Sequence, residues 1–500
     1  MFFAITGITN STLDIILGVL FVLTTLIILG CSIFYIIKHS NKEKATSLKK
    51  TLIIVLILAF LIRVLFSLVV IGHRRELFET IYATLKDPDY FVDPTEPPST
   101  RLYPLTYYII SFFASPFLTN DASYDSVVAN LFIKMPFILA DIVTAYLTFL
   151  IGKKFVNENV GIALCAIVAF CPIFFFASSL WGSIICLLLP VFLGVFLCIV
   201  DKKFVLAILL SSIALIIAKE GMIIFPVVLA YFVVVWTKNL IDLINKKTND
   251  AKNLFVIPIT AIVSTALIYV ISIPYTGPIS GNSFADFVEL FFVYPISDNW
   301  FFGTNALSIY SIFGFNTVDA KSVLDQFSIA LIFALFIAVI TGCSYAIKRN
   351  RALISVFACF GVYTICTYFV GFTALSILPV LPLMLLSYSL TKDKRFIISF
   401  SVTAFVLIAL VGTIYVNAGY YNTLPIDDFA YSDIYTGSTW LEDGVNKVIL
   451  IALSAISVIN HIFLTLTTFD IAINNRVLKF TPIEKPTFKH VLKQVFTNKE

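Results

Sequence analysis

The sequence is poor in charge and in the residue types that usually bind metals. Asp, Glu, Lys and Arg make up only 13% of its 500 residues, and the net charge at pH 7 is +4. A charge this small gives no indication of nucleic-acid binding, and we expect none. The four histidines are scattered, and the eight cysteines lie in or beside apolar runs without CxxC spacing. We therefore interpret the cysteines as small core residues and predict neither a disulfide framework nor a histidine or cysteine metal site.

Apolar residues are abundant. Hydrophobic residues make up 59% of the chain, which contains 49 Phe and 22 Tyr, and its mean hydropathy is +0.97. Soluble globular domains contain far less apolar sequence. In a bilayer the backbone must satisfy its own hydrogen bonds, which favours helices. The composition predicts an all-α polytopic membrane protein.

Basic residues predict the topology. Clusters of Lys and Arg in 42–50, 238–252, 348–351, 392–395 and after 476 mark cytoplasmic loops and a basic tail. By length the apolar runs number about thirteen. They lie near 13–37, 51–72, 130–152, 155–177, 181–200, 204–218, 221–238, 253–274, 327–347, 352–370, 372–391, 396–416 and 446–468. The N-terminus has no Lys or Arg before Lys38 and is therefore predicted to lie outside, and an odd number of spans then places the C-terminus inside.

The segments between these runs complete the predicted organisation. Residues 1–50 form an additional N-terminal span with its cytoplasmic loop, and 476–500 form the cytoplasmic tail. The apolar segment 104–118 is short for a span, and counting it as one would put nearby lysines outside, so we predict a re-entrant or interfacial segment. Three long segments, 73–129, 275–326 and 417–445, then lie outside the membrane.

The segment KMPFILAD, from Lys134 to Asp141, needs more explanation than its hydrophobicity supplies. One interpretation is a helix start, with Pro136 in the first turn and Lys134 at the membrane interface. That interpretation leaves Asp141 nearly two turns inside the span, where an ionisable group usually faces a bundle interior or an aqueous cavity. We therefore favour a functional role for Asp141 over a structural one.

The first external segment combines charge with apolar residues. Glu76, Glu79 and Tyr82 have one-turn spacings that suit an amphipathic helix lying at the membrane interface. A partly shielded carboxylate at such a place is suited to act as a general base on a hydroxyl. An ordinary solvated helix, with Arg74 and Arg75 against lipid phosphates, explains the same residues and is the commoner outcome for charged segments.

Taken in order, YPLTYYI, KMPFILADI, a Trp-Gly pair and AKEGMIIFP resemble the GT-C superfamily of polytopic glycosyltransferases, particularly its mannosyltransferase-like bacterial members. The resemblance covers about 71–382. It implies a conserved GT-C-like transmembrane module over 51–252, which carries the first external loop, and a variable transmembrane module over 253–475. It also implies an inverting enzyme that transfers a sugar from a polyprenyl-phosphate donor to an acceptor hydroxyl of a glycan, lipid or protein at the external face.

The resemblance assigns roles to particular residues. Glu76 matches the acid that acts as base or orients the acceptor, although the family usually has Asp there. Lys219 matches a lysine that can meet the donor phosphate, with Arg101 as a possible helper; snorkelling from a helix end is the alternative for Lys219. The pocket candidates are Tyr103, Pro104, Lys134, Asp141, Trp181 and Asn305.

No cofactor is certain, but some members of this family use a divalent cation. Asp87, Asp89 and Asp93 are spaced like possible ligands, and we favour instead the interpretation that they are turn acids around Pro88 and Pro94.

The chain also departs from the family pattern. The late His-Glu-Arg-Tyr-like group is replaced by residues 373–376, TALS, and the Trp-Gly pair lacks the Gln and acid that usually follow it. These losses imply either a different donor or acceptor, or a degenerate homologue that binds lipid-linked glycan or scaffolds other enzymes. A transporter or flippase of lipid-linked sugars is a third possibility, although no internal repeat supports it. The expected location is the plasma membrane of a bacterium, or the endoplasmic reticulum of a eukaryote.

Overall fold

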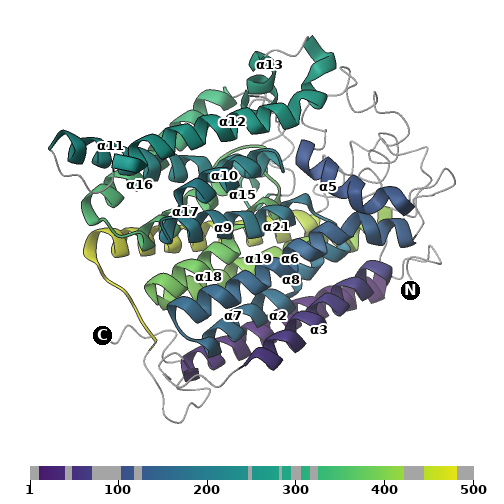
Figure 1. Cartoon of the computed structure of the whole chain (residues 1–500). Coiled ribbons are helices and arrows are strands. Elements are labelled where there is room, and N and C mark those ends of the chain that lie inside the picture. Colours follow the sequence, from purple (N-terminus) through teal and green to yellow (C-terminus); the bar gives the residue numbers. More distant parts are fainter. Residues whose placement is uncertain are drawn as a thin grey trace.

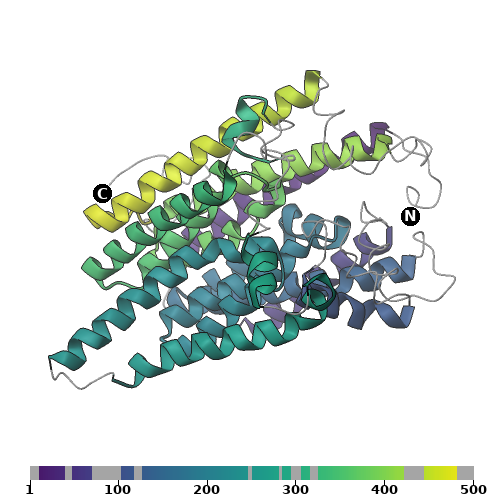
Figure 2. The same cartoon turned by 90° about the horizontal axis from the view of Figure 1, so that it is seen from above.

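The computed structural model describes residues 11–39, 48–69, 103–117, 127–245, 251–280, 284–293, 306–315, 325–421 and 444–480, and these form helices and no strands. Long helices lie side by side along a common direction (Figures 1 and 2). The labels α and η below denote helices and short 3-10 or π turns.

The first half of the chain contains α2 (Ser11–His39), α3 (Lys49–Val69), α5 (Pro104–Ala114), η3 (Ser115–Phe117), α6 (Val127–Phe155), α7 (Glu158–Phe170), α8 (Pro172–Phe175), η4 (Phe176–Leu180), η5 (Ile184–Leu187), α9 (Leu188–Val200), α10 (Phe204–Leu215), η6 (Lys219–Ile224) and α11 (Phe225–Ile244). The second half contains α12 (Ala251–Ser280), α13 (Phe284–Val288), η7 (Glu289–Val293), α15 (Ile309–Ile312), α16 (Gln326–Lys348), α17 (Ala352–Tyr368), η8 (Ala374–Ile377), α18 (Val380–Thr391), α19 (Lys394–Tyr421), α21 (Gly444–Phe469) and η10 (Asp470–Asn474).

Eight helices in the described part of the chain are long and apolar enough to cross a membrane. A ninth span results if Glu158–Phe170 and Pro172–Leu180, which meet at a bend of 47°, are taken together. Four shorter apolar helices lie at Val22–Lys38, Ile184–Val200, Phe204–Leu215 and Ala352–Tyr368. The prediction of an all-helical, multi-pass membrane protein is confirmed, while the strict length criterion yields fewer spans than the predicted number.

Burial separates an inner group of helices from an outer group. Nearly every residue of α18 is buried, and it lies in the middle of the bundle beside α19 and α6 in Figure 1. By contrast, α3, α12 and α16 lie toward the edges and expose large apolar side chains such as Leu65, Ile262 and Ile332. Apolar surface on this scale is unusual in water and ordinary in lipid. The outer helices therefore present the lipid-facing surface.

Several turns between helices gather at one end of the bundle, which we call the basic end: residues 153–158, 201–203, 348–351, 392–395 and 470–478. Lys154 forms an ion pair with Asp201. Arg351 donates a hydrogen bond of 3.2 Å to the carbonyl of Val200. These contacts join the turn after α9 to the turn after α16.

The segment that follows η10 joins two further basic turns to this end. Lys348 donates to the side-chain oxygen of Asn475 at 3.0 Å, and the backbone N–H of Lys394 donates to the carbonyl of Leu478 at 2.7 Å. The turns around Lys348 and Lys394 thus lie at the same end of the bundle, as the argument from basic loops requires. We call the opposite end the distal end.

Helix α5 begins and ends in the distal half of the bundle. The backbone N–H of Leu105 donates to the carbonyl of Ile216 at 3.0 Å, where α10 has reached the distal end. The ring of Phe117 stacks on Phe132, near the start of α6, at a centroid distance of 3.7 Å. The 11 residues of α5 give it a length of about 16 Å, roughly half the thickness of a hydrocarbon core. A helix of this length is too short to span the hydrocarbon core by itself, and the re-entrant or interfacial placement of this segment stays a prediction.

Helix α6 corrects one interpretation of the KMPFILAD segment. The helix begins at Val127, so Lys134 and Pro136 lie inside it and not in its first turn. The apolar residues before Lys134 extend the helix toward the distal end. Pro136 cannot donate to the carbonyl of Phe132, but membrane helices tolerate such a proline because neighbouring groups satisfy the freed carbonyl.

Candidate functional site

The candidate site lies where the connections containing η6 and η8 meet at the distal end. The chain leaves α10, passes residues 216–218 and enters the 3-10 turn η6 at Lys219. A second connection leaves α17 and enters the 3-10 turn η8 at Ala374. The two connections are bridged by side chains of η6.

Lys219 makes the first bridge. Its ammonium group donates a hydrogen bond of 2.8 Å to the carbonyl of Gly371 and lies 5.9 Å from the ring centroid of Phe372. Gly371 has a φ of +79°, a conformation that residues with a Cβ rarely adopt, so glycine presents this carbonyl at low cost. Snorkelling would require the Lys219 side chain to extend along its own helix toward the lipid headgroups. The side chain instead reaches the neighbouring connection at Gly371.

Glu220 makes the second bridge. Its side chain is buried and accepts a hydrogen bond of 3.0 Å from the hydroxyl of Ser376, which lies 156 residues later in the chain. A Cβ on the next residue, Gly221, would lie 1.9 Å from the carbonyl oxygen of Ala214. Only glycine therefore allows η6 to pack this closely against the end of α10, and this packing positions Glu220.

Ser376 belongs to residues 373–376, TALS, where the sequence lacks the charged group that the resemblance predicts. The hydroxyl of Ser376 also accepts from the backbone N–H of Thr373 at 3.2 Å, which closes a capping box around η8. In place of the predicted charged group, this chain has a serine that donates to Glu220. The sequence argument gave Glu220 no role, although an acid beside a lysine in an apolar run is a recognisable signal.

Tyr103 and Pro104 join the same end of the bundle. Pro104 occupies the first turn of α5, where its missing N–H has no helical partner to lose. The hydroxyl of Thr106 donates to the carbonyl of Ile217 at 2.6 Å, which holds α5 against the connection before η6. Burial, and in addition the nearby carboxylate of Glu220, raise the pKa of Tyr103. Its phenol therefore stays protonated at neutral pH and can donate a hydrogen bond.

Asp141 lies in a different arrangement, inside the bundle. Arg63 of α3 donates from Nε to Oδ2 of Asp141 at 2.7 Å, and Ser178 donates to the same oxygen at 3.0 Å. Both members of the ion pair are fully buried. Asp141 faces the bundle interior, as predicted, but its observed partner is a structural arginine that the sequence argument did not consider.

Arg63 also donates hydrogen bonds to backbone carbonyls at the bend between α7 and α8. Its guanidinium donates to the carbonyls of Ala169 at 2.7 Å and Val168 at 3.2 Å. These carbonyls lie just before Pro172, where the ring nitrogen has no proton to donate and the helix bends by 47°. Arg63 therefore ties α3, α6 and the α7–α8 bend together.

The remaining described candidates are Lys134 and Trp181. Lys134 is buried on α6, about two turns from Asp141 toward the distal end and on the same side of the helix. Trp181 follows the π turn η4, and its ring stacks on Phe176 at a centroid distance of 6.1 Å. Trp181 is half-buried and lies before the 3-10 turn η5, in the connection between α8 and α9.

The other predicted site residues lie outside the described residues: Glu76, Arg101, Asn305, Asp87, Asp89 and Asp93. Among the described ranges, no group of three or more His, Cys, Asp or Glu side chains could hold a metal ion.

Comparisons with protein-family models and with curated proteins find no match for this chain. The candidate site therefore stands on its own geometry. It offers a cation and a buried carboxylate on η6 and a phenol at the start of α5, and a third part of the chain, residues 371–376, bonds to the first two.

Proposed function

We propose that this chain is a membrane glycosyltransferase that transfers a sugar from a polyprenyl-phosphate donor to an acceptor hydroxyl at the external face. The supporting observation is that Lys219 and Glu220 lie at the end of the bundle opposite the basic turns, and that the start of α5, with Tyr103, is bonded there to the carbonyls of Ile216 and Ile217. Basic turns face the cytoplasm in membrane proteins, so this site faces outward. A phosphate leaving group needs a cation, and Lys219 supplies a compact one.

The proposed topology retains about thirteen spans. The eight long helices, the bent pair and the four shorter apolar helices together account for every predicted apolar run. In this proposal the shorter helices also cross, with the chain completing each span through the neighbouring turn, as η5 extends α9. The proposed segments 73–129, 275–326 and 417–445 then lie outside, and the membrane is the plasma membrane of a bacterium.

In the proposed reaction the acceptor oxygen attacks the anomeric carbon of the donor sugar with inversion. The acceptor proton passes to a carboxylate, for which Glu76 is the proposed base. The bond between the anomeric carbon and the phosphate oxygen breaks, and the phosphate leaves with the electron pair. Lys219, with Arg101, stabilises the charge that develops on this phosphate. The phenol of Tyr103 donates to a sugar hydroxyl, and Trp181 provides an aromatic surface for the ring.

The experiment is a transfer assay in membranes that contain each variant and a radiolabelled polyprenyl-phosphate sugar. Glu76→Gln removes the proton acceptor while keeping size, and we expect about a 10²- to 10⁴-fold loss of rate with donor binding preserved. Lys219→Ala should weaken donor binding and also slow transfer, because the lysine interacts with the charge of the leaving phosphate. Lys203→Ala, an exposed lysine at the basic end, is the matched control and should leave transfer unchanged.

Two outcomes would redirect the proposal. Full activity of Glu76→Gln together with inactivity of Glu220→Gln would move the base to Glu220. Equal activity of Lys219→Ala and Lys203→Ala would remove the distal-end site from the reaction, whatever the fold.

A second candidate function is a non-catalytic homologue that binds lipid-linked glycan. It is favoured by one observation: Lys219 and Glu220 each bond to a neighbouring connection, to Gly371 and Ser376. In a binding protein these contacts would hold a rigid receptor surface. Binding of the donor lipid to the wild-type chain, with no transfer to any acceptor tested, would support this candidate.

A further inference from the structure

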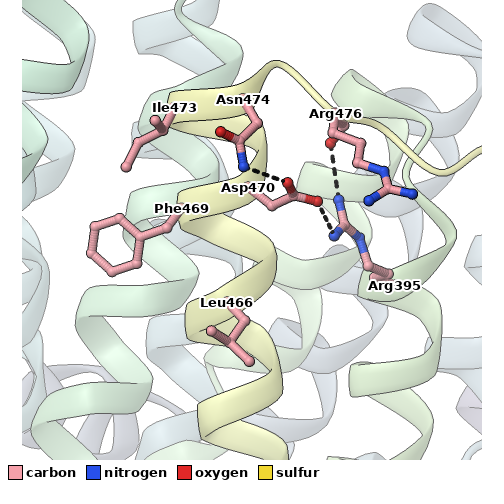
Figure 3. A pocket seen from close by; sticks show the side chains of 7 residues that line it. All are labelled: Arg395, Leu466, Phe469, Asp470, Ile473, Asn474 and Arg476. Carbon is pink, nitrogen blue, oxygen red and sulfur yellow. Dashed lines mark hydrogen bonds and ion pairs between the residues drawn. The ribbon is translucent and has the colours of Figure 1, made fainter.

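A pocket at the basic end combines an apolar wall with cationic side chains. Its volume is about 410 Å³, and it is lined by Arg395, Leu466, Phe469, Asp470, Ile473, Asn474 and Arg476. Figure 3 shows the apolar side chains on one side of the helix and the two arginines on the other. The pocket lies at the opposite end of the bundle from the candidate site, so it is separate from the proposed transfer reaction.

The cationic side of this pocket is rigid. The guanidinium of Arg395 bonds to Asp393 at 2.7 Å and to Asp470 at 2.7 Å, and it donates to the backbone carbonyl of Arg476 at 3.0 Å. Arg395 therefore fixes the backbone that carries the second guanidinium, and the side chain of Arg476 is exposed at the pocket.

The charge of the lining favours an anion. Asp470 is the one carboxylate in the lining, and both of its oxygens are engaged: Oδ2 by Arg395 and Oδ1 by the side-chain amide of Asn474 at 2.9 Å. Asp393 and Asp470 together balance the charge of Arg395 and of one further cation, so the excess positive charge at the pocket comes from having both Arg476 and the neighbouring Lys348 there. Lys348 lies beside the lining, donating to the carbonyl of Ile473 at 3.3 Å.

The apolar side continues into the lipid-facing surface of α21. Leu466 and Ile473 in the pocket are 64% and 66% exposed, and Ile459 and Ile462 extend the same surface along the helix. Their spacing of one or two turns puts them on one face. This stripe leads from the cationic groups toward the middle of the membrane, which is the course that acyl chains take below a headgroup.

Three of the residues that line the pocket belong to the π turn η10. The five residues of η10 have a wider helical turn, and the next residue, Asn475, has a φ of +55°. Turns of this kind are uncommon and often occur at functional sites. Here the turn brings Asp470 and Asn474 together and directs the chain across to Arg395.

We propose that this pocket binds an anionic phospholipid, with its phosphate against the exposed guanidinium of Arg476 and its acyl chains along the stripe on α21. Anionic lipids give the cytoplasmic leaflet its negative surface potential, and the basic turns place the pocket at that leaflet. A zwitterionic lipid has the same chains but no net charge to match the lining.

Native mass spectrometry of the detergent-solubilised full chain tests the proposal. We expect dioleoylphosphatidylglycerol to be retained in preference to dioleoylphosphatidylcholine, and Arg476→Gln to weaken its binding by about five-fold, as expected for the loss of one cation near an anionic lipid. Arg476→Gln leaves the backbone carbonyl that binds Arg395 in place. Lys238→Gln changes an exposed lysine of α11 outside the pocket and should bind as wild type does.

Inorganic phosphate and glycerol 1-phosphate are the probes for a soluble ligand. If either displaces the lipid at equal concentration, the pocket binds a free phosphate group and the lipid proposal is overturned. Equal retention of the two lipids would overturn it as well, and so would equal losses in Arg476→Gln and Lys238→Gln. Matching elution volumes and helical circular dichroism of the variants exclude misfolding as the cause.

Discussion

Replacing Arg63 by methionine tests whether the buried ion pair organises the middle of the bundle. Methionine keeps the unbranched apolar stem of the arginine, out to about the position of Nε, and lacks the guanidinium with its donors. Arg63 donates to Asp141 and to the carbonyls of Ala59, Ala169 and Val168. The substitution therefore leaves a buried carboxylate uncompensated and removes the donors at the α7–α8 bend.

The expected cost follows from these contacts. Removing one partner of a buried ion pair costs about 3–5 kcal/mol, because the remaining charge has lost its compensation. In a chain of 500 residues, whose unfolding entropy is about 1 kcal/mol/K, this corresponds to a fall of about 3–5 °C in the midpoint of thermal denaturation. The double variant Arg63→Met/Asp141→Leu removes both charges and leaves only the carbonyls at the bend and Ser178 without partners. It should recover more than half of the loss.

The assay is the loss of the monodisperse peak in size-exclusion chromatography after heating the purified protein in detergent, with all variants treated at one scan rate. The matched control is Lys154→Met, which removes a lysine from the exposed pair with Asp201. Exposed ion pairs contribute about 0–1 kcal/mol, so this variant should shift the midpoint by less than about 2 °C.

Two results would refute this reasoning. One is an Arg63→Met midpoint equal to that of Lys154→Met, which would mean that the buried pair contributes nothing. The other is a double variant that is no more stable than Arg63→Met, which would place the whole cost in the carbonyls of the bend. If the double variant also keeps transfer activity, Asp141 has a structural role and not the functional role that the sequence argument favoured.

The glycines and the topology supply further predictions. Gly221→Ala should greatly reduce the yield of folded protein in membranes, because its Cβ would lie 1.9 Å from a carbonyl oxygen, whereas Gly412→Ala, with nothing within 4 Å, should be neutral or slightly stabilising. A wild-type yield for Gly221→Ala would contradict the packing of η6. In whole cells, an impermeant maleimide should label a cysteine at Lys447, near Gly314 at the distal end, and should label one at Lys202 only after the cells are opened. The reverse pattern would invert the proposed orientation and put the candidate site in the cytoplasm.

Sequence reasoning reached part of the candidate site. It selected Lys219, Tyr103 and Pro104 through the resemblance to a known family. It gave Glu220 no role. The helix-start interpretation of Lys134 and Pro136 overlooked Asp125 and Ser126, which stand directly before the first residue of α6 and are residue types that favour a helix N-cap. Glu76 and Asn305 remain predictions that the described residues do not test.

The sequence by itself determined that the protein is an all-helical membrane protein, and it predicted which turns between the helices lie at the same end of the bundle. Apolar runs of spanning length can satisfy their backbone in lipid only as helices, and lysines and arginines mark the turns that stay on one side. Both properties are local, so they can be read without knowing which helices touch.

Only the tertiary structure decided the partners of the buried charges. Asp141 meets Arg63 across 78 residues, Lys219 meets Gly371 across 152, and Glu220 meets Ser376 across 156. Any lipid-buried charge requires a partner, so the sequence implies that partners exist. Their identity depends on which helices pack together, and similar apolar surfaces do not specify this in the sequence; shape, small residues and close backbone approaches such as that of Gly221 decide it.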